Sequence, residues 1–345
     1  MYDKDLMVRG HPRTLSENRK ELKMKKIVGY GAPFMDFLVG IDHLPTKKDE
    51  GARIQITSWQ GGGKVATALA AVGQLGGQAS MIGIAGKDTY GDFLIQDFKF
   101  YGIDTSHVMQ DGSNGFSVVL SDQVTKGRNI IARSPRQRPF TEDDIDADFI
   151  KQHDILHLEN MGPISVKMAE IMHEGGGKVA IDADGYSELT QSNLDKIDIF
   201  IGSEFYYNAV FGEGASEDLD RLEENLREFS KHGPEIVVFT LGDKGSAVYC
   251  KEGFRYAKGY KVDVVDTVGA GDTYHGAYLY ALADGMDPMD AAEFANAVAA
   301  IKCTSIGGRS GLPDREMTDS FMKTGKYDRT LIEKKVRRYE NFGNS

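Results

Sequence analysis

Short apolar runs alternate with stretches of helical periodicity along most of the chain. From residue 154 onward this alternation is regular, and it is typical of a mostly parallel sheet covered by helices on both faces. The predicted strands span residues 27–31, 81–85, 155–158, 178–182, 197–201, 235–241, 247–250 and 255–257. The predicted helices span residues 65–75, 90–101, 166–174, 218–232, 271–283, 288–302 and 331–339.

A different pattern occupies the region between the first strand and residue 133. Residues 53–57 alternate polar and apolar, and the runs 116–120 and 129–132 flank Lys126-Gly127 as a hairpin would. We expect these short strands to pair with one another as a flap beside the main sheet.

Composition narrows the class of protein. The 345 residues are enough for one large α/β domain or two small ones, and no linker marks a second domain. A net charge of -11 argues against a nucleic-acid surface. The two cysteines, Cys250 and Cys303, form no metal or disulfide pattern, and no apolar run approaches the ~20 residues of a membrane span. We expect a cytoplasmic protein whose residues 1–24 are an extension.

The stretch from Asp266 to Ala277 carries the strongest chemical signal. Gly269-Ala270-Gly271 lies between a predicted strand at 260–265 and a predicted helix, so its small residues let an anion approach free N–H groups. Asp272 follows in the first helical turn, where we expect it to stay ionised and to take a proton from a hydroxyl that attacks a bound phosphate. The alternative is a plain helix cap after a glycine turn.

Two further groups of residues are candidates for binding. Asp36 follows the first strand by a few residues, beyond the predicted strand end, where open α/β sheets bind ligands. Arg133, Arg136 and Arg138 form a local basic cluster that either meets an acidic substituent or is simply solvated.

Several motifs together resemble those of the ribokinase-like (PfkB) carbohydrate kinases, and the resemblance runs from about Lys25 to about Met322. The matching segments are Gly62-Gly63-Lys64 through Gly76, Gly86-Lys87-Asp88-Thr89-Tyr90-Gly91, Thr240-Leu241-Gly242-Asp243-Lys244-Gly245, Asp266 to Asp272, Ala295-Asn296-Ala297, and Gly307-Gly308 to Pro313. The resemblance implies a three-layer α/β fold with a mostly parallel sheet in one domain, residues 25–345, and a β-sheet lid from about 37–58 and 116–133.

The resemblance also implies the reaction and the residues that perform it. The γ-phosphoryl group of ATP would pass to a hydroxyl of a small sugar, with Asp272 as general base and Gly269, Ala270 and Gly271 as the anion hole. The implied sugar-binding residues are Asp36, Gly62, Gly63, Lys64, Thr67, Phe34 and Arg133. The implied ATP-binding residues are Thr240, Gly242, Gly245, Asn296 and Thr267.

The same resemblance implies that the protein binds two kinds of cation. Mg²⁺ would accompany the ATP phosphates and meet Glu204 through water. Asp266, with carbonyls near Ser305 and Gly307, would hold a monovalent cation such as K⁺, whose requirement is left open. The usual NxxE motif is altered to Ser203-Glu204-Phe205-Tyr206, so the metal assignment is the least direct.

The sequence differs from the family's motifs at positions that are expected to contact the acceptor sugar. Thr67 replaces the usual Asn and Phe34 replaces a polar amide, which favours a ketose or a substituted or acidic sugar over ribose. Residues 31–36 also resemble adenosine kinases, so a nucleoside kinase is the alternative, and a non-catalytic sugar or nucleotide sensor is another. His275 either faces the acceptor or is structural. We expect a homodimer formed through the lid.

Overall fold

The computed structural model describes residues 24–122, 124 and 128–340. The predicted extension, except Met24, and the Lys126-Gly127 turn therefore lie outside the described residues. In the described part, no helix is both long and apolar enough to cross a membrane.

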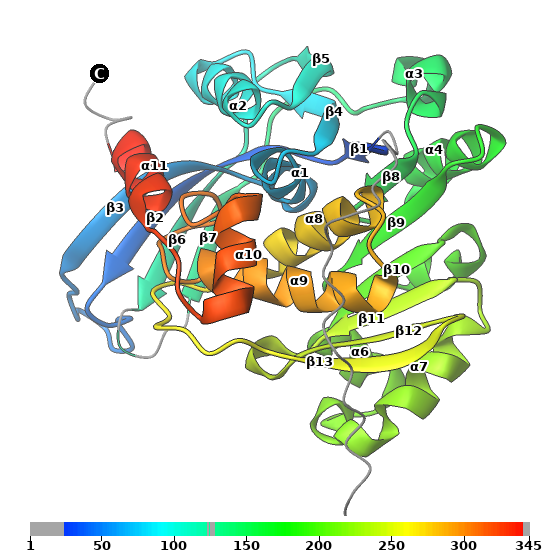
Figure 1. Cartoon of the computed structure of the whole chain (residues 1–345). Coiled ribbons are helices and arrows are strands. Elements are labelled where there is room, and N and C mark those ends of the chain that lie inside the picture. The colour runs from blue at the N-terminus through cyan, green and yellow to red at the C-terminus, as the bar shows by residue number, and fades with distance from the viewer. Residues whose placement is uncertain (1–23, 123, 125–127, 341–345) are drawn as a thin grey trace, which may run out of the picture.

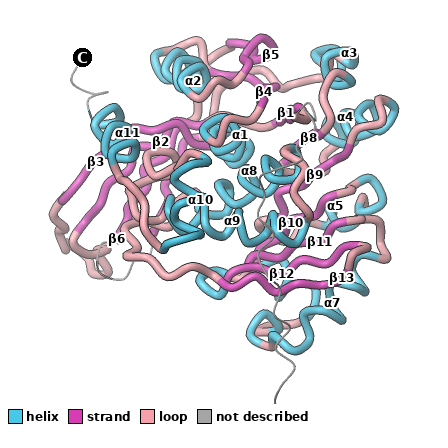
Figure 2. Tube along the Cα trace, viewed as in Figure 1, coloured by secondary structure: helices cyan, strands magenta, loops and turns pink. Residues whose placement is uncertain are grey.

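A nine-stranded sheet runs through the middle of the molecule (Figures 1 and 2). Its strands follow the order β13 (Gly253–Lys258), β12 (Gly245–Cys250), β11 (Ile236–Thr240), β10 (Ile199–Ser203), β9 (Lys178–Ala183), β8 (Ile155–Leu158), β1 (Lys26–Tyr30), β4 (Gln78–Ala85) and β5 (Asp104–Gln110). Neighbours from β11 to β5 are parallel, whereas β12 and β13 add antiparallel pairs at one edge. The predicted, mostly parallel α/β sheet is confirmed.

Helices cover both faces because successive strand residues point to opposite sides. Ile27 of β1 packs in one core and its neighbour Val28 in the other. The first face carries α1 (Lys64–Gln74), α2 (Thr89–Phe100), α8 (Ala270–Ala283) and α9 (Pro288–Lys302), with α10 (Arg315–Thr324) and α11 (Thr330–Glu340) packed outside them. The second face carries α3 (Ala147–Lys151), α4 (Pro163–Glu174), α6 (Glu204–Phe211) and α7 (Leu222–Ser230). The short helix α5 (Glu188–Gln191) follows β9, and 3₁₀ turns span Glu142–Asp144, Leu194–Lys196, Ala215–Glu217, Leu219–Arg221 and Gly242–Lys244.

A separate four-stranded sheet stands beside α1 and α11 (Figure 1). Its order is β3 (Ile54–Gly62), β2 (Phe34–Ile41), β6 (Phe116–Asp122) and β7 (Arg128–Arg133), and the pairing of β2 with β6 confirms that the early flap joins the hairpin. One face buries Leu38 and Val119 against Val268 and Ile306. The edge strand β7 is exposed along its whole length.

Two local predictions are wrong, and one is completed. Asp36 lies beyond the end of β1, as predicted, and belongs to β2 of the small sheet. Residues 260–265 form a loop, not a strand, because the N–H groups of Val265 and Asp266 donate to the carbonyl of Cys303 instead of a neighbouring strand. The predicted helix at 218–232 begins with a 3₁₀ turn and becomes α-helical at Leu222.

Arg309 joins the small sheet to the helical layer. Its fully buried guanidinium lies 2.6 Å from Asp97 of α2 and donates to the carbonyl of Gly62 in β3. The other carboxylate oxygen of Asp97 accepts the hydroxyl of Tyr339 from α11 at 2.8 Å. One buried ion pair therefore connects β3, α2 and α11.

Asp97→Ala should lower the free energy of unfolding by about 3–5 kcal/mol, because it leaves the Arg309 charge buried without a partner. Urea denaturation measures the loss. Asp319→Ala removes an exposed i,i+4 pair with Arg315 and should cost only about 0.3–0.5 kcal/mol. Equal losses in the two variants would contradict this account.

Candidate active site

The acceptor side of the site begins at Asp36, which β2 presents beside β3. Its carboxylate accepts the Ser117 hydroxyl at 2.5 Å, and burial raises its pKa despite that hydrogen bond. A β-carbon on Gly62 would stand 2.1 Å from an Asp36 oxygen, so only glycine allows this approach. Phe34 pairs with Gly62 across the two strands and its ring lies against Gly115. The structure thus brings three of the predicted sugar-binding residues together.

Lys64 places a positive charge among acidic side chains. It is the first residue of α1, and its ammonium lies 3.3 Å from the carboxylate of Asp184. Burial lowers its pKa, but the charges of Asp182 and Asp184 outweigh burial and raise it. Lys64 therefore stays protonated and faces the region shared with Asp272.

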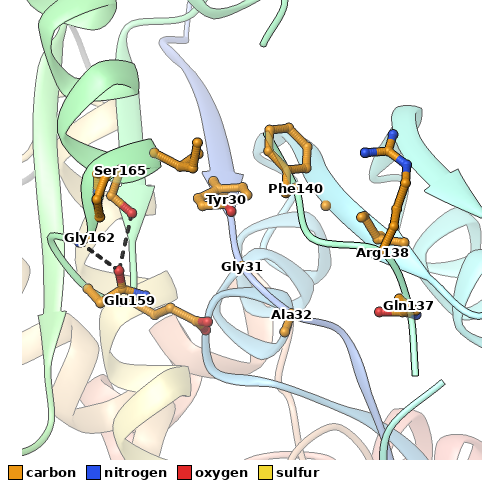
Figure 3. A pocket seen from close by; sticks show the side chains of 14 residues that line it. Tyr30, Gly31, Ala32, Gln137, Arg138, Phe140, Glu159, Gly162 and Ser165 are labelled. Atoms are coloured by element: carbon orange, nitrogen blue, oxygen red, sulfur yellow. Dashed lines mark hydrogen bonds between the residues drawn. The ribbon is translucent and has the colours of Figure 1, made fainter. Parts of the chain in front are cut away.

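Glu159 is a site residue that sequence reasoning missed. It follows β8 and extends its carboxylate toward Ala32 at the rim of a cavity of about 300 Å³ (Figure 3). Burial, with the nearby charge of Asp182, raises its pKa to about 7. Its place directly after a buried parallel strand was the available signal, since ligands bind at that edge of such sheets. The polar residues that line this cavity include Tyr30, Gln137, Arg138, Asn160 and Ser165.

The turn before α8 is the predicted glycine turn. Not every backbone N–H group that was predicted to bind an anion is free to do so, however. Gly269 is left-handed with φ 72°, and a β-carbon there would meet the Gly308 backbone at 2.8 Å. The N–H of Ala270 donates to the carbonyl of Thr267 and is therefore occupied. The N–H groups of Gly271 and Asp272 lie in the first turn of α8, where helices offer no internal acceptor.

Asp272 differs electrostatically from the prediction. Burial, followed by repulsion from Asp182, raises its pKa to about 8, while Lys64 opposes the shift. The expectation that it stays ionised is therefore wrong at neutral pH in the protein alone. The helix N-terminus is outweighed because several carboxylates share one poorly hydrated region.

The other residues predicted to contact the sugar or an acidic substituent do not all point into an open site. The side chain of Thr67 packs under the turn, next to Gly269 and Gly308. Arg133 donates to the carbonyl of Asn114, and Arg138 forms a bidentate pair with Asp144. Arg138 is therefore already neutralised.

A second cavity of about 430 Å³ lies on the other side of the turn. Its lining includes all five predicted ATP-binding residues, which are Thr240, Gly242, Gly245, Asn296 and Thr267. Glu204 lines it too, and an acidic side chain at a nucleotide cavity is the kind of oxygen ligand that would hold Mg²⁺ through water. Sequence reasoning missed Arg128, whose guanidinium reaches from β7 to the Thr267 hydroxyl at 3.2 Å.

The predicted monovalent-cation residues lie together but do not fit a bound K⁺. The Asp266 carboxylate accepts the N–H groups of Val268 and Gly307, and Ser305 bonds to Ser310. The ammonium of Lys302 donates to the backbone carbonyls of Asp266 and Val268. A positive charge of the chain itself already occupies this position.

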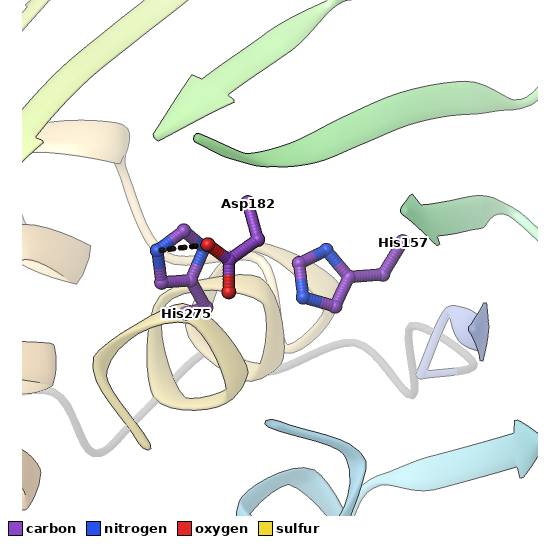
Figure 4. Close-up of side chains that lie close together, drawn as sticks. All are labelled: His157, Asp182 and His275. Atoms are coloured by element: carbon purple, nitrogen blue, oxygen red, sulfur yellow. Dashed lines mark ion pairs between the residues drawn. The ribbon is translucent and has the colours of Figure 1, made fainter. Parts of the chain in front are cut away.

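His275 has little exposed surface. It is buried between α8 and the sheet, 3.9 Å from Asp182, with His157 on the other side of that carboxylate (Figure 4). Burial lowers the pKa of His157 to about 4 and that of His275 to about 3, so both rings are neutral. The ligand-type atoms of His157, Asp182 and His275 lie within 4.8 Å of one another, and in residues 24–122, 124 and 128–340 this is the one group of at least three His, Cys, Asp or Glu side chains placed so that it could hold a metal ion.

The raised pKa of Asp272 predicts how stability changes with pH. Between about pH 4 and pH 8 the folded protein holds a proton that the unfolded chain releases, so stability falls as pH rises. Relative to wild type, Asp272→Asn should gain about 1–2 kcal/mol at pH 8, and this gain should shrink toward zero at pH 4. Urea denaturation across this range tests it, with the exposed Asp319→Asn as control. A pH-independent difference would overturn the assignment.

Comparisons with known proteins agree with this geometry. A family model described as pfkB family carbohydrate kinase matches residues 24–315. The 5-dehydro-2-deoxygluconokinase of Clostridium perfringens is 30% identical over 293 residues, covering 77% of this chain and 84% of that protein. The ribokinase of Haemophilus influenzae is 30% identical over 270 residues, covering 76% and 87%.

Solved structures show the same fold. Ribokinase from Thermotoga maritima has a TM-score of 0.72 at 28% identity and covers 87% of this chain and 100% of that one. Arabidopsis thaliana ribokinase, complexed with ribose and ATP, has a TM-score of 0.73 at 24% identity, covering 87% and 99%. The predicted resemblance and the ribokinase-like fold are confirmed, and the chain belongs to the pfkB family of carbohydrate kinases.

Proposed function

We propose that this ATP-dependent carbohydrate kinase phosphorylates a hydroxyl of a small ketose or substituted sugar, with Asp272 as the general base. The observation that carries the proposal is the position of Asp272. Its carboxylate interacts with Asp36 and Lys64 on one side, while Ala270 and Gly271 of the same turn line the 430 Å³ cavity on the other. The base thus lies between an acceptor region and a nucleotide cavity.

The chemistry follows from these positions. Asp36 and Glu159 accept hydrogen bonds from sugar hydroxyls and orient the acceptor. Ionised Asp272 takes the hydroxyl proton as the oxygen bonds to the γ-phosphorus and the bond to the bridging oxygen of ADP breaks. The first-turn N–H groups of α8 stabilise the negative charge of the transferring group. Glu204 would hold Mg²⁺ through water, and that ion would neutralise charge on the phosphates.

The electrostatics suit this role. A general base works best when its pKa lies near the working pH, and the pKa of Asp272 is raised to about 8. Lys64 faces the same carboxylate and favours its ionised form. The acidic crowding therefore makes Asp272 a stronger base, and Lys64 limits how far its pKa rises.

The acceptor class rests on the pocket and on one relative. Phe34 and Thr67 offer no amide for ribose-like recognition, and the 300 Å³ cavity beside Glu159 gives room for a longer or substituted acceptor. The relative from Clostridium perfringens is named for a hexose-derived acid, 5-dehydro-2-deoxygluconate. Since Arg138 is paired with Asp144, Arg133 and Arg136 are the cations of this cluster that remain for an acidic substituent.

Asp272→Asn should reduce kcat by about 10²–10⁴-fold in an ADP-release assay over a panel of ketoses, sugar acids and nucleosides. The KM for ATP should change little, since the variant removes a charge that acts on the acceptor proton. Equal background rates in both proteins with every acceptor would favour a sensor without catalysis. A thermal shift with adenosine, and none with any sugar, would favour a nucleoside kinase.

We also propose that the small sheet is a lid over the acceptor and that two copies pair through it. Three of its isoleucines are strongly exposed: Ile54, Ile130 and Ile131. They lie on the edge strands β3 and β7, where unpaired backbone and apolar surface favour association.

Wild type should therefore be a dimer by light scattering, and Ile131→Glu should be a folded monomer because a charge then enters the apolar contact. Leu219→Glu, an exposed position on the helical side, should remain dimeric. A monomeric wild type would refute the lid dimer.

A further inference from the structure

Lys302 is a fully buried lysine at the C-terminal end of α9. A buried ammonium is costly unless oxygen atoms replace its water. Its Nζ donates to the backbone carbonyl of Asp266 at 3.1 Å and to that of Val268. Two main-chain oxygens of one short segment therefore hold this charge.

The surroundings of Lys302 are built around that segment. The Asp266 carboxylate accepts the N–H groups of Val268 at 3.0 Å and Gly307 at 2.8 Å, which turns the carbonyls of 266 and 268 toward the ammonium. The carbonyl of Lys302 itself accepts the N–H of Ser305. Rings of carbonyl oxygens around a single positive charge are the usual environment of a bound monovalent cation.

We propose that the ammonium of Lys302 is a built-in replacement for a monovalent cation, and that this kinase is not activated by K⁺. The site that the family resemblance implied for K⁺ lies around Asp266, Ser305 and Gly307. Beside it is a lysine of the same charge, which donates to the carbonyls of Asp266 and Val268. No step of the reaction then needs an exchangeable monovalent ion. The kinetic part of this inference rests on the proposed function, whereas the ion-binding part does not.

The position of Lys302 indicates that its positive charge holds the peptide that leads into the anion-binding turn. Val268 directly precedes Gly269, so the bond to its carbonyl fixes the peptide that enters the anion-binding turn. Lys302 lines neither of the two cavities and acts through the turn. It is a positioning residue, and its loss should lower kcat more than it changes the KM for ATP.

The kinetic test compares wild type with Lys302→Ala in buffers containing K⁺, NH₄⁺, Na⁺ or tetramethylammonium as the only monovalent cation. The wild-type rate should differ less than about twofold between K⁺ and tetramethylammonium. Lys302→Ala should lose about tenfold or more in tetramethylammonium and recover in K⁺ or NH₄⁺, because a freed site accepts an ion. Strong K⁺ activation of wild type, or a variant that no cation rescues although it folds, would overturn the proposal.

Lys335→Met is the matched control. Lys335 is also a buried lysine that donates to a backbone carbonyl, that of Leu312, but it belongs to α11 and does not contact the carbonyls of Asp266 or Val268. This variant should lose stability without acquiring a dependence on K⁺. If it acquired the same dependence, the effect would reflect general loosening and the proposal would fail.

A second measurement needs no turnover. The melting temperature of Lys302→Ala should rise with added KCl or RbCl relative to tetramethylammonium chloride, and crystals soaked in RbCl should show anomalous density between the carbonyls of Asp266 and Val268. Wild type should show neither effect. Rubidium bound in wild type at these carbonyls would refute the inference, even if no acceptor had been found. Failure of the kinase assay with every acceptor would instead count against the proposed function.

Discussion

The buried ion pair between Arg309 and Asp97 is the constraint on which the acceptor side depends. The guanidinium also reaches the carbonyl of Gly62, so it fixes the end of β3. That strand end must pass against the Asp36 carboxylate with no side chain between them. If the pair were absent, the small sheet would still hold its own hydrogen bonds, but the end of β3 would lose its charged link to α2.

More carboxyl groups lie around Asp272 than the ammonium of Lys64 can neutralise. Burial is the first cause of a raised pKa at four carboxyl groups, those of Asp36, Glu159, Asp182 and Asp272. Such crowding destabilises the folded chain, and it is typical of functional sites. The apolar packing of α8 against α1 and the sheet holds these groups together despite their repulsion.

Most of the fold could be predicted because buried parallel strands are short apolar runs and the main helices are strongly periodic. The helix α6 was missed because its 8 residues are nearly all apolar or aromatic and show no helical period, and α10 was missed because its 10 residues include few apolar ones. Residues 260–265 alternate like a strand, yet Tyr260 packs on Phe321 and the segment pairs with no strand. In the site, motif residues could be placed by resemblance. The pKa of Asp272 could not, since it depends on Asp182 from a distant strand.

Lys302 shows a different limit of sequence reasoning. It continues the buried face of α9 defined by Ala291, Ala295 and Val298, so its spacing was a sign of burial. Spacing alone cannot say which oxygens a buried ammonium will meet. That depended on Asp266 and Val268, which are 36 and 34 residues away in the chain.

The contact of Asp97 with Arg309 and Tyr339 also bears on the order in which the chain folds as it is synthesised. Arg309 is 212 residues and Tyr339 is 242 residues downstream of Asp97. Asp36, Gly62 and Lys64 therefore leave the ribosome long before the residues that hold them in place, with the edges of the small sheet still uncovered. A nascent chain can pair its first strands early, but the acceptor site becomes complete only when α11 has emerged and closed over Asp97.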